Sequence, residues 1–228
     1  MRLRPRRLNT TVAALFMVGA AGFAVGSLSA FASAVSATAD AVTFFVASLF
    51  FTAASFGQLV QSQSPAMAAT GSALDDERRP VRLLAWLPHD RAWLAAAVQF
   101  LGTICFNVTT SRAISTASAA GGYDVVVWRP DFYGSILFLV SSAFAILALG
   151  RVLSWRPRAG AWWIAWLNMA GSVAFMASAI GAYVLPKTGA AVDLTLADRG
   201  TLVGAACFFA GAWLAVPVWR GEKRDGGA

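Results

Sequence analysis

Few side chains within the long apolar runs of this chain could take part in chemistry, and most of them are carboxamides. Gln99, Asn107 and Asn168 lie inside such runs, and Arg129 and Asp131 flank a proline directly before another run. Carboxamides in an apolar setting usually hydrogen-bond across helices, with gains of about 0.6–2 kcal/mol. Together with the charged pair, they could also line the path of a small solute or ion. These five residues are therefore the candidate binding residues.

Arrangements typical of catalysis are missing from the sequence. It contains no zinc-ligand spacing, nucleophile elbow, phosphate-binding loop or Ser/His/Asp set. Its single histidine, His89, falls in a polar loop. We expect no enzyme activity, no catalytic residue, no metal and no cofactor.

Two cysteines, Cys105 and Cys207, occupy equivalent offsets in two of the apolar runs. One interpretation is a redox pair. The favoured interpretation is two small residues in a dry helix seam, because reactive thiolates need a positive and accessible setting. Asn107 also begins a glycosylation sequon, but its place within an apolar run argues against modification.

The apolar runs predict a multi-pass membrane protein. Of 228 residues, 58% are hydrophobic and 13% charged, whereas soluble domains are about 25% charged. Runs of roughly 20 apolar residues can cross a ~30 Å hydrocarbon core as α-helices. The predicted fold is an all-α transmembrane bundle of six helices. The spans are expected at about 10–34, 41–60, 92–111, 132–150, 161–184 and 200–219.

The domain organisation follows from these spans. We expect an N-terminal helical hairpin with a cytoplasmic linker (1–91), a four-helix region (92–219) and a cytoplasmic tail (220–228). The beginning of the chain also resembles a secretory signal peptide, with small residues at positions 30, 32 and 34. Because its apolar run is long enough to span, an uncleaved first helix is favoured over cleavage.

Basic residues predict the orientation. The side with both termini would carry 14 of the 18 basic residues, against four on the other side: Arg112, Arg129, Lys187 and Arg199. By the positive-inside rule, both termini are expected in the cytoplasm, in a bacterial plasma membrane. Since the basic residues lie at span ends rather than on one soluble face, nucleic acid is not an expected partner.

One pattern recurs in the spans: a small residue, Phe four positions later, and a small residue three after that. Offsets of 0, 4 and 7 fall on one helical face. The full pattern occurs at Gly102-Phe106-Thr109, Gly134-Phe138-Ser141, Gly171-Phe175-Ser178 and Gly204-Phe208-Gly211, with weaker versions at Gly19-Phe23-Gly26 and Ala47-Phe51-Ala54. We interpret this small–Phe–small stripe as a packing seam, with a pore or ligand pocket as the alternative.

The spacing of the stripes suggests a tandem helical-hairpin repeat. Segments 92–150 and 161–219 correspond, and the first two spans could be a degenerate third copy. Three residues before each of the last four stripes stand Gln99, Asp131, Asn168 and Thr201. We therefore expect these four polar side chains on the face that meets other helices.

The Arg-Pro-Asp tripeptide is expected to begin the fourth helix. Pro130 would occupy the first turn, where its missing N–H has no cost. Asp131 would then meet the positive end of the helix dipole, as a cap or rim ion pair. An entry site for a solute or ion is the alternative, because Asp131 also lies on the stripe.

Four segments, LGTICFNVTT, VWRPDFYGSILFLVSSAF, NMAGSVAFMASAIGAYVLP and GTLVGAACFFAGAWLAVP, resemble the YrhK-like family of bacterial integral membrane proteins. The resemblance covers about residues 93–218, and its most distinctive letters are Trp128-Arg129-Pro130-Asp131 and Asn168. It implies helical hairpins and a membrane location. Because this family has no assigned reaction or substrate, it implies no catalytic residues.

Two functions are compatible with the sequence. The first is a membrane packing or assembly protein, which could form a homo-oligomer and whose partner is the lipid bilayer. The second is a transporter or channel for a small solute or ion, using the intramembrane amides and an outer charged rim. The rim residues, of both signs, are Arg112, Asp124, Asp131, Lys187, Asp193, Asp198 and Arg199. The substrate of such a conduit is not readable from the sequence.

Overall fold

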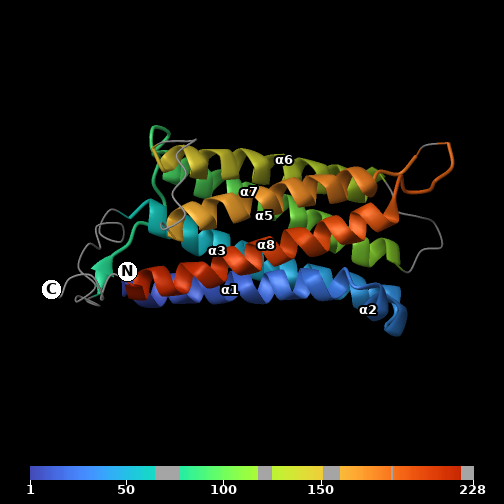
Figure 1. The fold of residues 1–228 in the computed structure, drawn as a ribbon, viewed down its shortest axis with the longest axis horizontal. Coiled ribbons are helices and arrows are strands. Elements are labelled where there is room, and N and C mark those ends of the chain that lie inside the picture. The colour runs from blue at the N-terminus through green and yellow to red at the C-terminus, as the bar shows by residue number, and fades with distance from the viewer. Residues whose placement is uncertain (65–77, 118–124, 151–159, 186, 222–228) are drawn as a thin grey trace.

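The computed structural model describes residues 1–64, 78–117, 125–150, 160–185 and 187–221 (Figure 1). In these residues, six helices are long and apolar enough to cross a membrane. They are α1 (Pro5–Gly26), α3 (Ala37–Ser62), α5 (Arg91–Ala117), α6 (Val125–Ala148), α7 (Gly160–Gly181) and α8 (Leu194–Gly221). The short helix α2 (Ser29–Ala34) follows α1, and strands β1 (Arg2–Leu3) and β2 (Arg79–Pro80) pair antiparallel. The all-α bundle of six apolar helices is thus confirmed.

Side chains at the helix starts supply hydrogen bonds that the backbone lacks there. Ser36 Oγ accepts from the Ala39 amide at the start of α3. Asp90 Oδ1 accepts from the Ala92 and Trp93 amides before α5, and Asp193 Oδ1 accepts from the Leu196 amide before α8. Such caps satisfy the first amides of a helix, which have no intrahelical acceptor.

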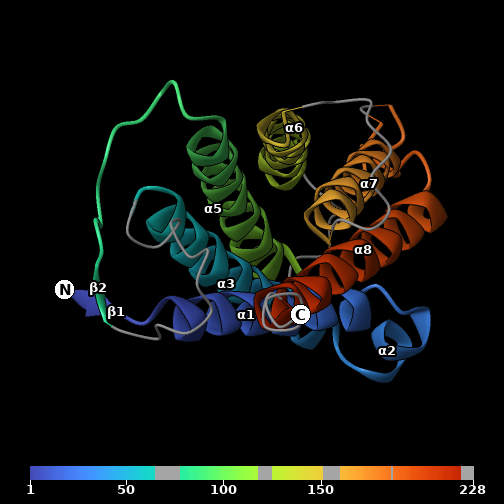
Figure 2. The ribbon, with the colours of Figure 1, turned by 60° about the vertical axis from the view of Figure 1, so that its left-hand side comes forward.

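The six long helices form a closed ring in the order α1, α3, α5, α6, α7, α8 and back to α1 (Figure 2). Successive helices pair as three hairpins, α1/α3, α5/α6 and α7/α8. The N-terminal hairpin therefore completes the ring, because α3 packs on α5 and α1 packs on α8. We call the end of the bundle where α1 begins and α8 finishes the terminal end, and the end near α2 the far end (Figure 1).

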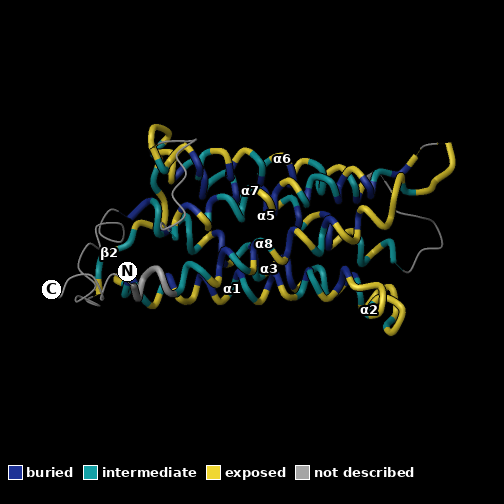
Figure 3. The backbone as a smooth tube through the Cα atoms, in the orientation of Figure 1, coloured by how far each residue is buried: buried dark blue, intermediate teal, exposed yellow. Residues whose placement is uncertain are grey.

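The small–Phe–small stripes face the inside of this ring. Every stripe residue is buried, in all six helices, and the exposed residues lie on the outer side and on α2 (Figure 3). The six stripe phenylalanines belong to one buried cluster: Phe23, Phe51, Phe106, Phe138, Phe175 and Phe208. The interpretation of the stripe as a packing seam is consistent with this burial.

Glycine and phenylalanine fit each other reciprocally within each of the last two hairpins. A Cβ on Gly102 would lie 2.8 Å from the Phe138 ring, and one on Gly134 would lie 3.1 Å from the Phe106 ring. The α7/α8 hairpin repeats this arrangement, with Gly171 against Phe208 and Gly204 against Phe175. The two hairpins therefore pack alike, because each ring needs a facing position without a side chain.

The prediction of one continuous first span over 10–34 is wrong. Helix α1 ends at Gly26, and α2 begins at Ser29 after a non-helical Leu28. Ser27 Oγ donates to the Phe23 carbonyl at 2.7 Å, so the end of α1 is closed by its own side chain. None of the α2 residues is buried.

The prediction that Pro130 and Asp131 begin the fourth helix is also wrong. Helix α6 starts at Val125, so Pro130 lies inside it and Asp131 lies in its second turn. Asp131 is therefore neither a helix cap nor a first-turn acidic residue. The predicted linker and tail fall partly outside the described residues, at 65–77 and 222–228.

Candidate functional site

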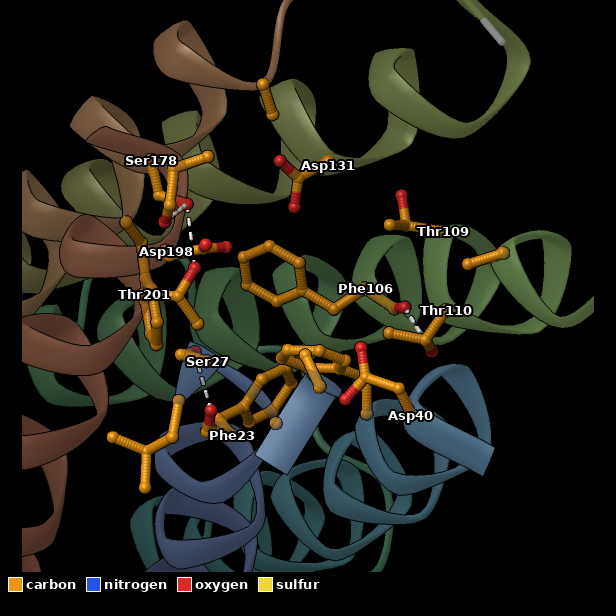
Figure 4. Close-up of a pocket in the computed structure, with 18 of the residues that line it drawn as sticks. Phe23, Ser27, Asp40, Phe106, Thr109, Thr110, Asp131, Ser178, Asp198 and Thr201 are labelled. Carbon is orange, nitrogen blue, oxygen red and sulfur yellow. Dashed lines mark hydrogen bonds between the residues drawn. The ribbon is translucent and has the colours of Figure 1, made fainter. Parts of the chain in front are cut away.

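A cavity of about 220 Å³ opens at the far end of the bundle. Helices from all three hairpins line it, and each hairpin contributes one carboxylate: Asp40 from α3, Asp131 from α6 and Asp198 from α8 (Figure 4). We call it the carboxylate cavity. Its other polar lining consists of hydroxyl groups on Ser27, Ser29, Thr109, Thr110, Ser178 and Thr201.

The three carboxylates reach the cavity from different depths. Asp198 is exposed, whereas Asp40 and Asp131 are half-buried. Figure 4 shows the Asp131 carboxylate pointing into the cavity. Asp40 and Asp198 lie close enough for their negative charges to repel.

Proline in the α6 interior explains how Asp131 is held. Pro130 has no N–H for the Val126 carbonyl one turn earlier. Arg112 from α5 donates its Nη1–H to that carbonyl at 2.8 Å, and Thr109 Oγ1 donates to the Val127 carbonyl at 2.9 Å. Side chains of α5 thus replace or supplement the helical bonds on the turn that carries Asp131.

No positive charge balances these carboxylates within the cavity. Among the described residues that line it, none is Arg, Lys or His. The Asp40 Oδ1 atom is buried and has no hydrogen-bond partner. Removing carboxylates from water costs free energy unless a positive charge or hydrogen bonds compensate. The cavity is therefore electrically suited to a cation.

The three carboxylates do not form a cluster that could hold one metal ion directly. No group of three His, Cys, Asp or Glu side chains within the described ranges lies close enough to hold a metal ion. A cation in the carboxylate cavity would therefore keep much of its water shell. The hydroxyl lining and the volume both allow this, since a water occupies ~30 Å³ in the liquid.

The stripe phenylalanines close the cavity on its inner side. Phe23, Phe51, Phe106 and Phe175 form its floor. The ring centroids of the stripe phenylalanines lie 5.1–6.5 Å from those of their neighbours, as expected for aromatic pairs. We call this cluster the phenylalanine plug. Its rings occupy the middle of the bundle.

A second cavity, of about 100 Å³, lies on the other side of the plug. Phe16 and Phe208 separate it from the middle of the bundle. Its polar lining consists of carboxamides, and we call it the amide cavity. The five carboxamide residues are Asn9 from α1, Gln58 and Gln61 from α3, Gln99 from α5 and Asn168 from α7.

The structure divides the five candidate residues between different places. Gln99 and Asn168 line the amide cavity, and Asp131 lines the carboxylate cavity. Asn107 lines neither of them, although its Oδ1 atom is buried without a hydrogen-bond partner. Arg129 is exposed and also lines neither. The candidate residues therefore do not form one site.

Antiparallel helices explain why the shared stripe offset leads to two cavities. Gln99 and Asn168 precede their stripes in α5 and α7, which run away from the terminal end (Figure 1). Asp131 and Thr201 precede theirs in α6 and α8, which run the other way. The same offset therefore places the amides Gln99 and Asn168 toward the terminal end. It places the Asp131 carboxylate and the Thr201 hydroxyl toward the far end.

The sequence placed Asp198 only in the outer charged rim and Gln58 only among the amides toward an inner helix end, and it did not single out Asp40, Asn9 or Gln61. Charge-free windows placed the start of the second and last spans after the two aspartates, whereas α3 and α8 both begin earlier. Thr109, the last residue of the α5 stripe, was expected in a packing seam. It also borders the carboxylate cavity. The sequence did contain a signal for the aspartates. In the second helix of each hairpin, one aspartate lies within about three turns before the stripe phenylalanine.

The two cysteines take no part in either cavity. Cys105 and Cys207 are free thiols, half-buried, and line neither cavity. This arrangement is consistent with the interpretation as small residues near helix contacts.

Comparison of the chain with protein-family models, with curated proteins and with solved structures gives no match. Its class therefore rests on its own structure. Six apolar helices of 22 to 28 residues make it a multi-pass integral membrane protein.

Proposed function

We propose that the protein is a gated conduit for a small inorganic cation. One observation carries this proposal: three carboxylates, one from each hairpin, line a single cavity with no basic side chain among its described lining residues. Ionisable side chains within membrane helices are costly and usually mark ion or solute pathways. Rings of Asp or Glu are a common means of selecting cations.

The size of the cavity supports a small ion over an organic solute. Sites for drug-sized ligands measure ~300–1,000 Å³, whereas the carboxylate cavity measures about 220 Å³. About seven waters would fill it at ~30 Å³ each. A hydrated cation fits this space, and its charge offsets the repulsion between Asp40 and Asp198.

The phenylalanine plug supports a closed resting state. Hydrophobic constrictions can stop ions by excluding water. The phenylalanine side chains of the plug fill the space enclosed by the six helices, between the two cavities. Passage of a cation then requires the phenylalanines to move apart. We propose that this movement is the gate.

The proposed orientation follows the distribution of basic residues. With 14 of the 18 on the side of the termini, the positive-inside rule favours cytoplasmic termini in a bacterial plasma membrane. The carboxylate cavity would then face the outside. We propose further that α1 is retained, because it packs between α3 and α8, that the chain is not an enzyme, and that it is related to the YrhK-like proteins.

Uptake into proteoliposomes tests the proposal. The purified full chain should admit radioactive sodium, rubidium or calcium, and Asp131→Asn should reduce that uptake by roughly tenfold, equivalent to about 1.4 kcal/mol of lost attraction. Asp193→Asn is the matched control, because Asp193 caps α8 at the same end without lining the cavity and Asn caps equally well. Uptake by no tested cation, or equal loss in both variants, would refute the conduit.

A packing or assembly role is the second candidate. The observation that favours it is the buried phenylalanine plug, which needs no substrate to explain it. Under this alternative, liposomes with the wild-type protein and liposomes with Asp131→Asn would both admit no cation. The uptake experiment therefore separates the two functions.

A further inference from the structure

The amide cavity combines burial with an unusual surplus of carboxamide groups. Asn9 and Gln99 are buried, with exposed fractions of 9% and 6%. The other three carboxamides that line the cavity are half-buried. In an ordinary packing interface, groups of this kind would hydrogen-bond to each other across the helices. No hydrogen bond joins any two of the five in the described structure.

Oxygen atoms in particular lack donors. Gln58 Oε1 is buried and has no hydrogen-bond partner. Gln99 Oε1 accepts one long bond of 3.4 Å, from Ser141 Oγ. Asn9 donates its Nδ2–H to the Ala215 carbonyl at 3.3 Å, a bond to the backbone rather than to another carboxamide. A buried acceptor without a donor is unfavourable, so an ordered water or a bound ligand is expected beside it.

Size and charge restrict that ligand. The cavity of about 100 Å³ holds the equivalent of about three waters, which is too little for an organic solute of drug size. No charged side chain occurs among its described lining residues. Divalent cations generally take carboxylate ligands, whereas rings of carbonyl oxygens can replace the water shell of a monovalent cation.

We propose that the amide cavity is a second binding site, for a partly dehydrated monovalent cation held by the oxygens of Gln58, Gln99 and Asn168. This inference rests on the proposed function, because the cation is the one admitted through the carboxylate cavity. The two sites lie on opposite sides of the phenylalanine plug. A cation would be hydrated and held by charge in the first site, and stripped of water and held by neutral oxygens in the second.

Thallium(I) is a suitable probe, since it is monovalent and its anomalous scattering locates it in a crystal. Crystals of the full chain grown in a thallium salt should show two anomalous peaks, one in each cavity. The double variant Gln58→Met, Gln99→Met closely matches the original side-chain volumes and removes two of the three proposed ligand oxygens. It should lose the amide-cavity peak and keep the carboxylate-cavity peak. Asp131→Asn should have the opposite effect.

Each result separates the two proposals. A wild-type peak in the carboxylate cavity alone overturns the amide site and leaves the conduit standing. A peak in the amide cavity alone supports the amide site and refutes the outer one, and no peak in either cavity overturns both. An amide-cavity peak that persists in the double variant contradicts the assignment of its ligands. The wild-type map decides the matter even where the double variant does not fold.

Discussion

Pro130 and Arg112 together determine the backbone that carries Asp131. Proline within a helix removes one hydrogen bond and commonly destabilises it by ~3 kcal/mol. Here the Val126 carbonyl that loses its donor accepts from Arg112 Nη1 instead. The arginine therefore has a structural role on α5, and the exposed Arg129 next to the proline has no part in this bond.

A double-mutant cycle tests this pairing. Arg112→Met should reduce the free energy of unfolding by about 1 kcal/mol, the usual value of one hydrogen bond. In a Pro130→Ala background the helix regains its own N–H donor, so the same substitution should cost much less. Thermal unfolding of the four proteins in detergent measures the difference. Equal costs in both backgrounds would show that Arg112 does not compensate for the proline.

The position of Asp131 shows where single-residue prediction fails. Proline is common in the first turn of helices, and the residue before proline disfavours helical backbone, so a helix starting at Pro130 was the natural expectation. Contacts from Arg112 and Thr109 override that local preference. Such compensation depends on a neighbouring helix, which no local pattern reveals. The amides Gln99 and Asn168 were predictable because their stripe offset alone determines which face they occupy.

Close approach of α7 and α8 is the clearest packing feature at the level of whole helices. A Cβ on Gly200 would lie 2.7 Å from the Ser178 backbone nitrogen and 2.8 Å from the Ala174 carbonyl oxygen. Backbone atoms cannot rotate away as a flexible side chain can. The small residue at this position therefore sets the distance between the two helices.

Gly200→Ala should consequently destabilise the bundle, although alanine is the better helix former. We expect a loss of about 1–3 kcal/mol, typical of overpacking. Val203→Ala on the same helix serves as the control, because Val203 is 53% exposed and should change stability little. A Gly200→Ala protein as stable as the wild type in thermal unfolding would contradict the close packing.

At the level of whole helices, the sequence predicted well which residues are buried and poorly which helices pack against each other. The small–Phe–small offsets correctly indicated the inward face of all six helices, since offsets of 0, 4 and 7 must share a face. They did not indicate that α1 and α3 insert between α5 and α8, because every stripe offers the same small and aromatic groups. Nor did they reveal the break at Leu28, where the apolar run continues without a proline or glycine at the break itself.

As a whole molecule, the protein is a ring of three hairpins around a buried aromatic centre, with a polar cavity on either side. The phenylalanine plug stabilises the ring and also separates the cavities, so packing and gating depend on the same residues. Burial of every stripe explains the fold without any ligand. The unbalanced carboxylates of one cavity and the unpaired Gln58 oxygen of the other are what packing alone does not explain.

Water accessibility of introduced cysteines tests this arrangement most directly. In a protein with Cys105→Ala and Cys207→Ala, single cysteines would replace Thr201 in the carboxylate cavity, Asn168 in the amide cavity and Ala205, which is fully buried. A membrane-impermeant cationic thiol reagent should label Thr201→Cys only from the side opposite the termini and Asn168→Cys only from the side of the termini. Ala205→Cys should stay unlabelled. Silence at both cavity positions, or labelling of Ala205→Cys, would contradict two wet cavities separated by a closed plug.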